Sequence, residues 1–171
     1  MQTRTSLLSA FTLSTAMALG AAAMAADLPK EGTFNVTYFG FGTSKATAIG
    51  MDRLLAPFDQ NGLTVGNGIL DHMTWHCSGL FDVANGMAQW QNRCVGTDPA
   101  GDQIVSDGAS DGKYAVDARS FSGTGTFTTG TGKFAGISGG WTGVFHSPEF
   151  RTTADGSVAE YGSHKGSYKL P

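Results

Sequence analysis

The stretch from Cys77 to Cys94 reads CSGLFDVANGMAQWQNRC and places two cysteines symmetrically about the pair Asn85-Gly86. Asn-Gly is a strong signal for a two-residue hairpin turn, because both turn residues need positive φ. Cys77 precedes Asn85 by eight residues, and Cys94 follows Gly86 by eight. A hairpin folded about this pair joins residues whose numbers sum to 171, so Cys77 faces Cys94.

The alternation of side chains along both arms agrees with this register, in which Phe81 faces Trp90. One face of the hairpin collects the apolar side chains of Met73, Trp75, Cys77, Phe81, Val83, Ala88, Trp90 and Cys94. A slip of one residue would move all of them to the other face. The two cysteines occupy a non-hydrogen-bonded pair, where Cα atoms approach to about 4.5 Å, at the short end of disulfide geometry. We predict a disulfide, and the alternative is two free buried cysteines.

Residues 1–25 have the pattern of a cleavable signal peptide. Arg4 lies in a short polar head, residues 7–24 are mostly apolar without a carboxylate, and Ala23-Met24-Ala25 matches a cleavage site. The alternative is a membrane anchor, but hydroxyl side chains interrupt the apolar stretch, which lacks the ~20 predominantly apolar residues of a spanning helix. We predict cleavage, export to the periplasm or beyond, where a disulfide persists, and one domain over residues 26–171 without a membrane span.

Charge and glycine content narrow the class of the mature domain. Its net charge is about −4, since Arg4 is lost from a formal −3. The charges are scattered without a basic run beside aromatic residues, so we expect no nucleic-acid partner. The chain has 25 glycines and 5 prolines. Glycines spread through alternating segments predict strongly bent strands, as in a small barrel.

Alternating apolar and polar residues predict about eight strands with short connections. Residues 52–62 are expected to cap one end of the barrel, because Pro57 interrupts a regular element. Residues 40–42 are expected to form a turn and residues 107–113 a polar loop. The expected strands cover residues 32–39, 44–51, 68–84, 87–95, 102–106, 116–128, 139–146 and 157–170, with one helical turn at 133–137. The fold class is thus all-β: a closed antiparallel barrel of about eight strands with glycine-rich bends.

Residues 121–140 read FSGTGTFTTGTGKFAGISGG, and their core at 130–139 resembles a signature of allene oxide cyclase-like and dirigent-like barrels. In those barrels a glycine-rich strand end is followed by one helical turn and a returning strand. Glycines permit the tight backbone geometry, while Phe134 and Ile137 can plug the barrel end. The resemblance implies the barrel fold, in an exported member of bacterial type.

The resemblance does not carry over a cyclase activity. The plant cyclases use a carboxylate and an amide group on the first strand, whereas residues 33–39 of this chain hold Asn35 and no acid. No residue is therefore assigned a catalytic role. An enzyme is less favoured than a binding protein.

Other motifs give weak signals. His72 and His76 are four residues apart, which on a strand separates them by ~13 Å, too far to share one ion. Residues 136–140 match G-x-S-x-G but lack the strand before and helix after that a nucleophile elbow needs. The acidic residues of 98–111 lack the compact spacing of a calcium loop. We expect no metal and no cofactor.

The barrel interior is the best candidate for a site. A ligand pocket is predicted along the side chains of Phe34, Val36, Tyr38, Met73, Trp75, Phe81 and Trp90. Aromatic-lined barrel mouths are frequent sites for small apolar ligands, although the same side chains can simply fill the barrel.

Two functions follow from this interior. We expect an exported, non-enzymatic barrel that binds a small hydrophobic molecule or serves as an interaction module. The alternative is an allene oxide cyclase-like isomerase or cyclase acting on a lipid-like substrate. An inward-facing carboxylate or histidine with a perturbed pKa would favour the enzyme. Related barrels often form trimers, and the sequence singles out no interface for an oligomer.

Overall fold

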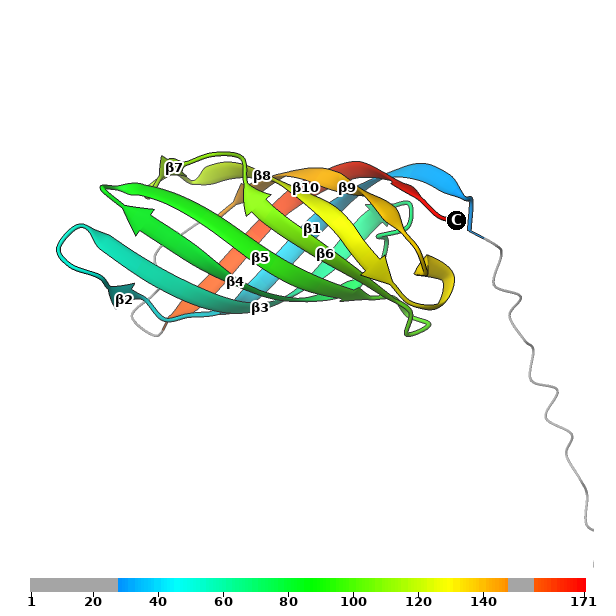
Figure 1. Cartoon of the computed structure of the whole chain (residues 1–171), viewed down its shortest axis with the longest axis horizontal. Coiled ribbons are helices and arrows are strands. Elements are labelled where there is room, and N and C mark those ends of the chain that lie inside the picture. The colour runs from blue at the N-terminus through cyan, green and yellow to red at the C-terminus, as the bar shows by residue number, and fades with distance from the viewer. Residues whose placement is uncertain (1–27, 148–155) are drawn as a thin grey trace, which may run out of the picture.

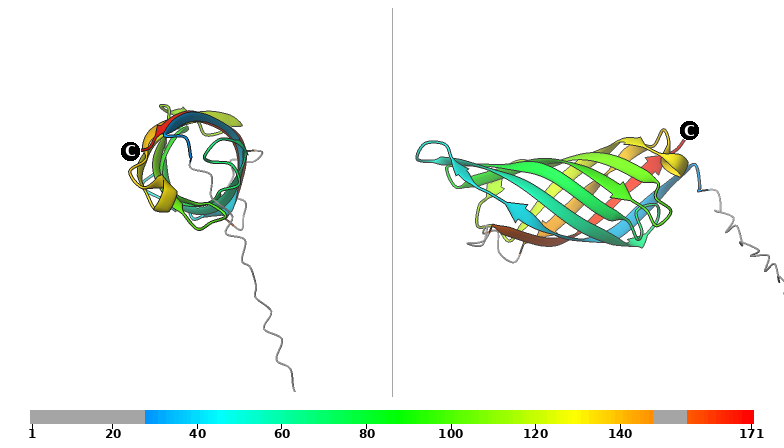
Figure 2. Two further views of the ribbon diagram at one scale, coloured as in Figure 1. Left: turned by 90° about the vertical axis from the view of Figure 1, so that its right-hand side faces the viewer. Right: turned by 90° about the horizontal axis from the view of Figure 1, so that it is seen from below.

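The computed structural model describes residues 28–147 and 156–171. Within these residues, eight long strands form a closed antiparallel barrel in which β1 pairs with both β3 and β10 (Figure 1). The end-on view in Figure 2 shows the closed ring. The strands are β1 (Glu31–Ser44), β3 (Arg53–Asn67), β4 (Thr74–Ala84), β5 (Met87–Thr97), β6 (Gln103–Ser110), β8 (Ser120–Gly130), β9 (Ser138–His146) and β10 (Ser157–Lys169). The predicted all-β closed barrel is confirmed, whereas the predicted signal peptide lies outside the described residues.

Three short elements complete the described chain. β2 (Thr47–Ala48) pairs with β3, and β7 (Tyr114–Ala115) pairs with β5. The 3-10 turn η1 (Gly132–Phe134) lies where the sequence predicted one helical turn. No helix in the described ranges is long and apolar enough to span a membrane.

The hairpin of β4 and β5 has the predicted register. Cys77 faces Cys94, and Phe81 faces Trp90. Asn85 and Gly86 form the turn with φ values of 52° and 73°. The Sγ atoms of the two cysteines lie 2.05 Å apart, at bonding distance. Turn geometry and side-chain alternation therefore sufficed to predict this part of the barrel.

Inward-facing glycines make room for the aromatic rings of other inward-facing residues. A Cβ atom at Gly125 would overlap the ring of Trp141, and one at Gly123 would overlap Trp90. The same relation recurs around the barrel at Gly32 with Tyr168, Gly40 and Gly62 with Tyr38, Gly79 with Phe58, Gly96 with Trp75, Gly143 with His164, and Gly166 with Phe34. The abundance of glycine thus reflects the need to fit large rings inside a narrow barrel.

The end of the barrel near the C-terminus is closed by the turn between β3 and β4. Residues 68–73 form this turn, not the predicted start of a strand, because Gly68 and His72 adopt φ values of 89° and 56°. Met73 and Leu70 are fully buried there. The Thr64 hydroxyl donates a hydrogen bond to the Leu70 carbonyl, which holds the turn inside the barrel.

The predicted turn at residues 40–42 is wrong, because β1 continues through it to Ser44. Gly40 and Gly42 face the interior, where Gln60 and the backbone of β3 occupy the space that side chains would need. The predicted strand over 44–51 shrinks accordingly to β2. Glycine here permits close packing within a strand and does not end it.

The predicted end cap at residues 52–62 is also wrong, because this segment belongs to β3. Pro57 is tolerated in the strand because its backbone faces the side where pairing with β1 ends, after Ser44 and Phe58. The Pro57 carbonyl there accepts hydrogen bonds from the Ser44 hydroxyl and the Lys45 amide. Pro57 has no amide hydrogen, but on this side of the strand the lack of it removes no backbone hydrogen bond between β3 and β4.

The predicted loop at residues 107–113 is partly strand. β6 extends to Ser110, and β8 begins at Ser120, later than expected. Arg93 of β5 donates two hydrogen bonds to Asp107, at 2.6 and 2.7 Å. This side-chain pairing across the two strands accounts for an acidic residue that reads as a loop residue in the sequence.

Candidate functional site

Polar and aromatic side chains surround a cavity of about 40 Å³ in the middle of the barrel. Tyr38, Asn92, Ser106, Glu160 and His164 supply its polar groups. Trp75, Trp141, Phe145 and the two cysteines supply much of its apolar wall. A cavity of this size has room for a few water molecules.

Glu160 is the carboxylate of this site. It faces Gly40 of β1, and the missing side chain of that glycine lets the carboxylate reach across β1 to β3. There Glu160 accepts a hydrogen bond of 2.8 Å from Nε2 of Gln60. Burial raises the pKa of Glu160 to about 7, opposed by the hydrogen bond from Gln60. The carboxyl group is therefore partly protonated near neutral pH.

His164 lies between two aromatic rings. Its ring centroid is 5.4 Å from that of Tyr38 and 4.7 Å from that of Trp141, with both pairs stacked. Burial lowers the pKa of His164 to about 4, so the ring is neutral near pH 7. Among the described residues its Nε2 atom is buried and has no hydrogen-bond partner.

Three further polar residues, Asn92, Ser106 and Tyr38, complete the cavity. Among residues 28–147 and 156–171, Oδ1 of Asn92 is buried without a hydrogen-bond partner. Ser106 Oγ accepts a hydrogen bond of 2.9 Å from Nε1 of Trp141. Burial, with a smaller contribution from Glu160, raises the pKa of Tyr38, which keeps its phenol protonated. The cavity thus presents one carboxyl group, one neutral imidazole and one free amide oxygen beside aromatic walls.

The predicted pocket residues all contribute to the interior, but they do not all reach this cavity. Tyr38 and Trp75 line it. Phe81 is partly buried and packs against the hydrophobic core. The core itself contains the remaining four, Phe34, Val36, Met73 and Trp90.

Apart from Tyr38, the sequence prediction did not include the polar residues that define the cavity. The strand over 157–170 was predicted, and its alternation places Glu160, His164 and Tyr168 on the same face. Tyr168 is a large residue suited to the core, so its side chain is expected to point inward. The alternation then predicts that Glu160 and His164 point inward as well. Gln60 was missed because its segment was not predicted to be a strand.

His72 and His76, which are four residues apart in the sequence, each lie beside a different carboxylate. Nδ1 of His72 lies 2.9 Å from a carboxylate oxygen of Asp71, in the turn before β4. Nε2 of His76 lies 3.3 Å from Asp59 on the outer wall. The expected distance between His72 and His76 rested on both residues lying on one strand. His72 instead lies in the turn before β4.

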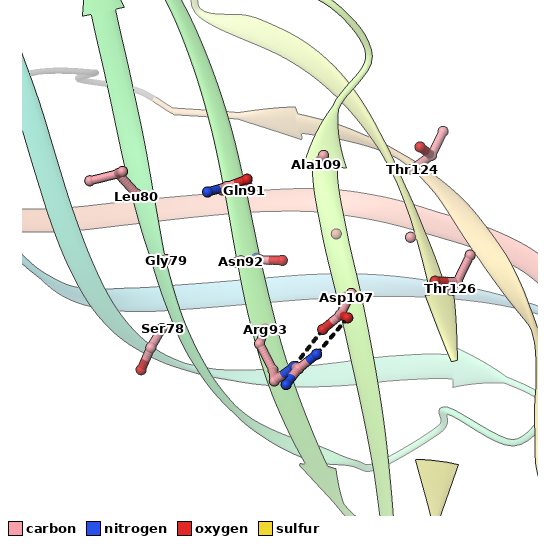
Figure 3. Close-up of a pocket in the computed structure, with 12 residues that line it drawn as sticks. Ser78, Gly79, Leu80, Gln91, Asn92, Arg93, Asp107, Ala109, Thr124 and Thr126 are labelled. Atoms are coloured by element: carbon pink, nitrogen blue, oxygen red, sulfur yellow. Dashed lines mark hydrogen bonds and ion pairs between the residues drawn. The ribbon is translucent and has the colours of Figure 1, made fainter. Parts of the chain in front are cut away.

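A shallow depression of about 650 Å³ lies on the outer wall over β4, β5, β6 and β8. Figure 3 shows its lining, including the paired side chains of Arg93 and Asp107. Gly79, Gly108 and Gly125 contribute to this lining without side chains. Since the charged groups that line the depression pair with each other, it offers a ligand less chemistry than the interior does.

Comparisons with known proteins bear on the fold. Searches against protein-family models and against curated proteins found no match. Among solved structures, the chain is similar to a pterocarpan synthase dirigent protein, with a TM-score of 0.49 and 10% sequence identity over 95% of this chain and 98% of that chain.

Proposed function

We propose that this protein is an exported β-barrel that binds a small, largely hydrophobic molecule in its interior. The observation that carries the proposal is the cavity between His164 and Asn92, whose buried Nε2 and Oδ1 atoms have no partner among the described residues. A buried polar group without a partner costs about 1–3 kcal/mol. A ligand that hydrogen-bonds to these atoms would remove that cost.

The lining indicates the chemistry of the ligand. Trp75, Trp141 and Phe145 favour an apolar or planar body. Asn92 Oδ1 accepts hydrogen bonds, so the ligand should carry at least one donor. A drug-sized ligand needs a pocket of about 300 Å³ or more. Anything much larger than a few water molecules therefore requires the aromatic rings to move.

Export is supported by one feature of the sequence and one of the structure. Residues 1–25 have the composition and cleavage pattern of a signal peptide. Cys77 and Cys94 lie at bonding distance, and such a bond persists in an oxidising compartment. A periplasmic or secreted location accounts for both.

Native mass spectrometry of the protein purified from the periplasm tests the proposal. We expect a bound small molecule in the wild type and in His76→Phe, a control on the outer wall. His164→Phe keeps the stacked ring but removes the nitrogen, so it should weaken binding by about tenfold, the value of one hydrogen bond. A wild-type protein that carries no small molecule, or equal occupancy in both variants, would contradict interior binding.

One observation favours a second function, that of an isomerase or cyclase. The Glu160 carboxyl lies in the cavity with a pKa of about 7, which suits proton transfer near neutral pH. If Glu160 catalyses an isomerisation, the Glu160→Gln variant should contain the unconverted substrate, while the wild type contains the product isomer. Chromatography of the released compounds distinguishes the two, and the same compound in both proteins would argue for binding alone.

A further inference from the structure

Exposed apolar side chains gather on one side of the barrel, over β3, β1, β10 and β9. We call this the uncharged face, and it consists of Phe39, Phe41, Leu63, Val65, Val144 and Tyr161. Phe41 is 67% and Phe39 is 51% exposed. Most outward positions of a barrel in water carry polar side chains, so a cluster of this kind marks an interaction surface.

Strand register shows that the uncharged face is continuous. Phe39 lies directly between Leu63 of β3 and Tyr161 of β10. The ring of Tyr161 stacks on His146 of β9, with centroids 5.1 Å apart. Phe41 follows Phe39 on the same side of β1. The side chains therefore form one patch across four neighbouring strands.

The distribution of charge separates this patch from the rest of the outer wall. Thr37, Asn61 and Ser163 are the polar neighbours that the register places beside it. Among the described residues that strand pairing places next to the patch, the charged ones are Asp59 and Lys165, at its borders. The wall over β3 to β6 instead carries ion pairs, namely Arg53 with Asp82 and Arg93 with Asp107, and Asp59 lies there beside His76.

We infer that the uncharged face binds a second copy of this chain. A whole aromatic side chain has a surface of ~200 Å². With the exposed fractions of Phe39, Phe41 and Tyr161, the three aromatic side chains together expose roughly 300 Å². Leu63, Val65 and Val144 bring the exposed apolar area toward roughly 500 Å². This is roughly the apolar area that one partner contributes to a standard homodimer interface. The apolar area is thus sufficient for a stable pair.

A second copy also fits the chemistry of this face better than a lipid surface or an unrelated charged protein does. Isologous association places the same surface on both sides of the interface. In such a dimer, neither surface buries a charged group that would lose its hydration without gaining an oppositely charged partner. An anionic membrane would require basic residues within the patch, and Lys165 lies only at its border.

Sedimentation velocity of the mature chain over a wide concentration range tests the inference. We expect a concentration-dependent dimer in the wild type. Phe39→Glu places a charge at the centre of the uncharged face and should weaken association by at least about 30-fold, as expected for a central hot spot. Met87→Glu is the matched control, because Met87 is an exposed apolar residue outside the face.

Near-UV circular dichroism of each variant establishes that the barrel is folded. A wild type that stays monomeric at the highest concentration would overturn the inference. So would a dimer that Phe39→Glu and Phe41→Glu both leave intact. Binding of the monomeric wild type to vesicles of anionic lipid, lost in Phe39→Glu, would assign the face to membranes instead.

Discussion

Glu160 and His164 lie on the same inward face of β10. Burial shifts the pKa of each group in the direction that favours its neutral form. The pKa of Glu160 rises from 4.5 to about 7, and that of His164 falls from 6.5 to about 4. Both groups therefore bind or release protons differently in the folded and unfolded states. The dependence of stability on pH reports directly on this pair.

The two residues should act on stability in opposite directions. Between pH 4.5 and about 7, the folded state retains the Glu160 proton that the unfolded state loses, so stability falls as the pH rises. Between pH 6.5 and about 4, the unfolded state binds a proton at the histidine that the folded state does not, so stability falls as the pH drops. In wild type the two slopes largely cancel where they overlap.

Single variants should expose each slope. Glu160→Gln leaves the histidine contribution, so the free energy of unfolding should rise from about pH 4 to 6.5. His164→Phe leaves the glutamate contribution, so the free energy of unfolding should fall from pH 4.5 to about 7. Each change amounts to at most about 3 kcal/mol. Urea unfolding at a series of pH values measures both, and parallel curves for the two variants would contradict the assignment.

At the scale of a single element, β8 and β9 depend on an inward glycine. A Cβ atom at Gly125 would overlap the indole of Trp141. We therefore expect Gly125→Ala to destabilise the barrel by about 1–3 kcal/mol and to change the tryptophan fluorescence. Thr124→Val, on the exposed side of the same strand, should stay within about 0.5 kcal/mol of wild type. Equal stability of the two variants would argue against ring packing at Gly125.

The hairpin of β4 and β5 gives a second prediction at this scale. Cys77 and Cys94 are separated by 17 positions in the sequence. Closing a loop of this size by a disulfide stabilises a fold by about 3 kcal/mol. Replacing both cysteines by alanine should therefore lower the free energy of unfolding by about that amount. The same loss is expected when the wild type is reduced, and no response to the reductant would show that the cysteines are not bridged.

At the scale of the whole molecule, closure joins distant parts of the chain. β1 pairs with both β3 and β10, so the first and last strands are neighbours. A closed barrel leaves none of these eight strands with an unpaired edge. The glutamate of β10 can reach the glutamine of β3 only because the intervening β1 carries glycine at position 40.

Export is a prediction for the whole chain. If residues 1–25 are removed, the mature protein begins at Ala26, and a disulfide lowers its mass by two hydrogen atoms. Intact-mass analysis of the periplasmic fraction should find this species. Alkylation under denaturing conditions should leave it unmodified until it is reduced. A full-length mass in the cytoplasm, or two alkylated cysteines without reduction, would contradict export of a bridged protein.

The sequence by itself determined the features that depend on neighbouring residues. Asn85-Gly86 and the alternation around it specify the register between Cys77 and Cys94, because turn geometry and the two-residue period act locally. The same period, repeated along the chain, determined the all-β class and most of the strands. Glycine and proline, taken as signals that end a strand, were misleading at residues 40–42 and 52–62, where they are tolerated for reasons that lie on adjacent strands.

Only the tertiary structure decided what the interior contains. Glu160 and Gln60 are 100 positions apart and meet because closure brings β10 and β3 to either side of β1. The uncharged face likewise exists only when four strands lie side by side. Local propensity acts over a few residues, whereas a cavity or a surface patch depends on which strands become neighbours, and pairing around the closed barrel determines that.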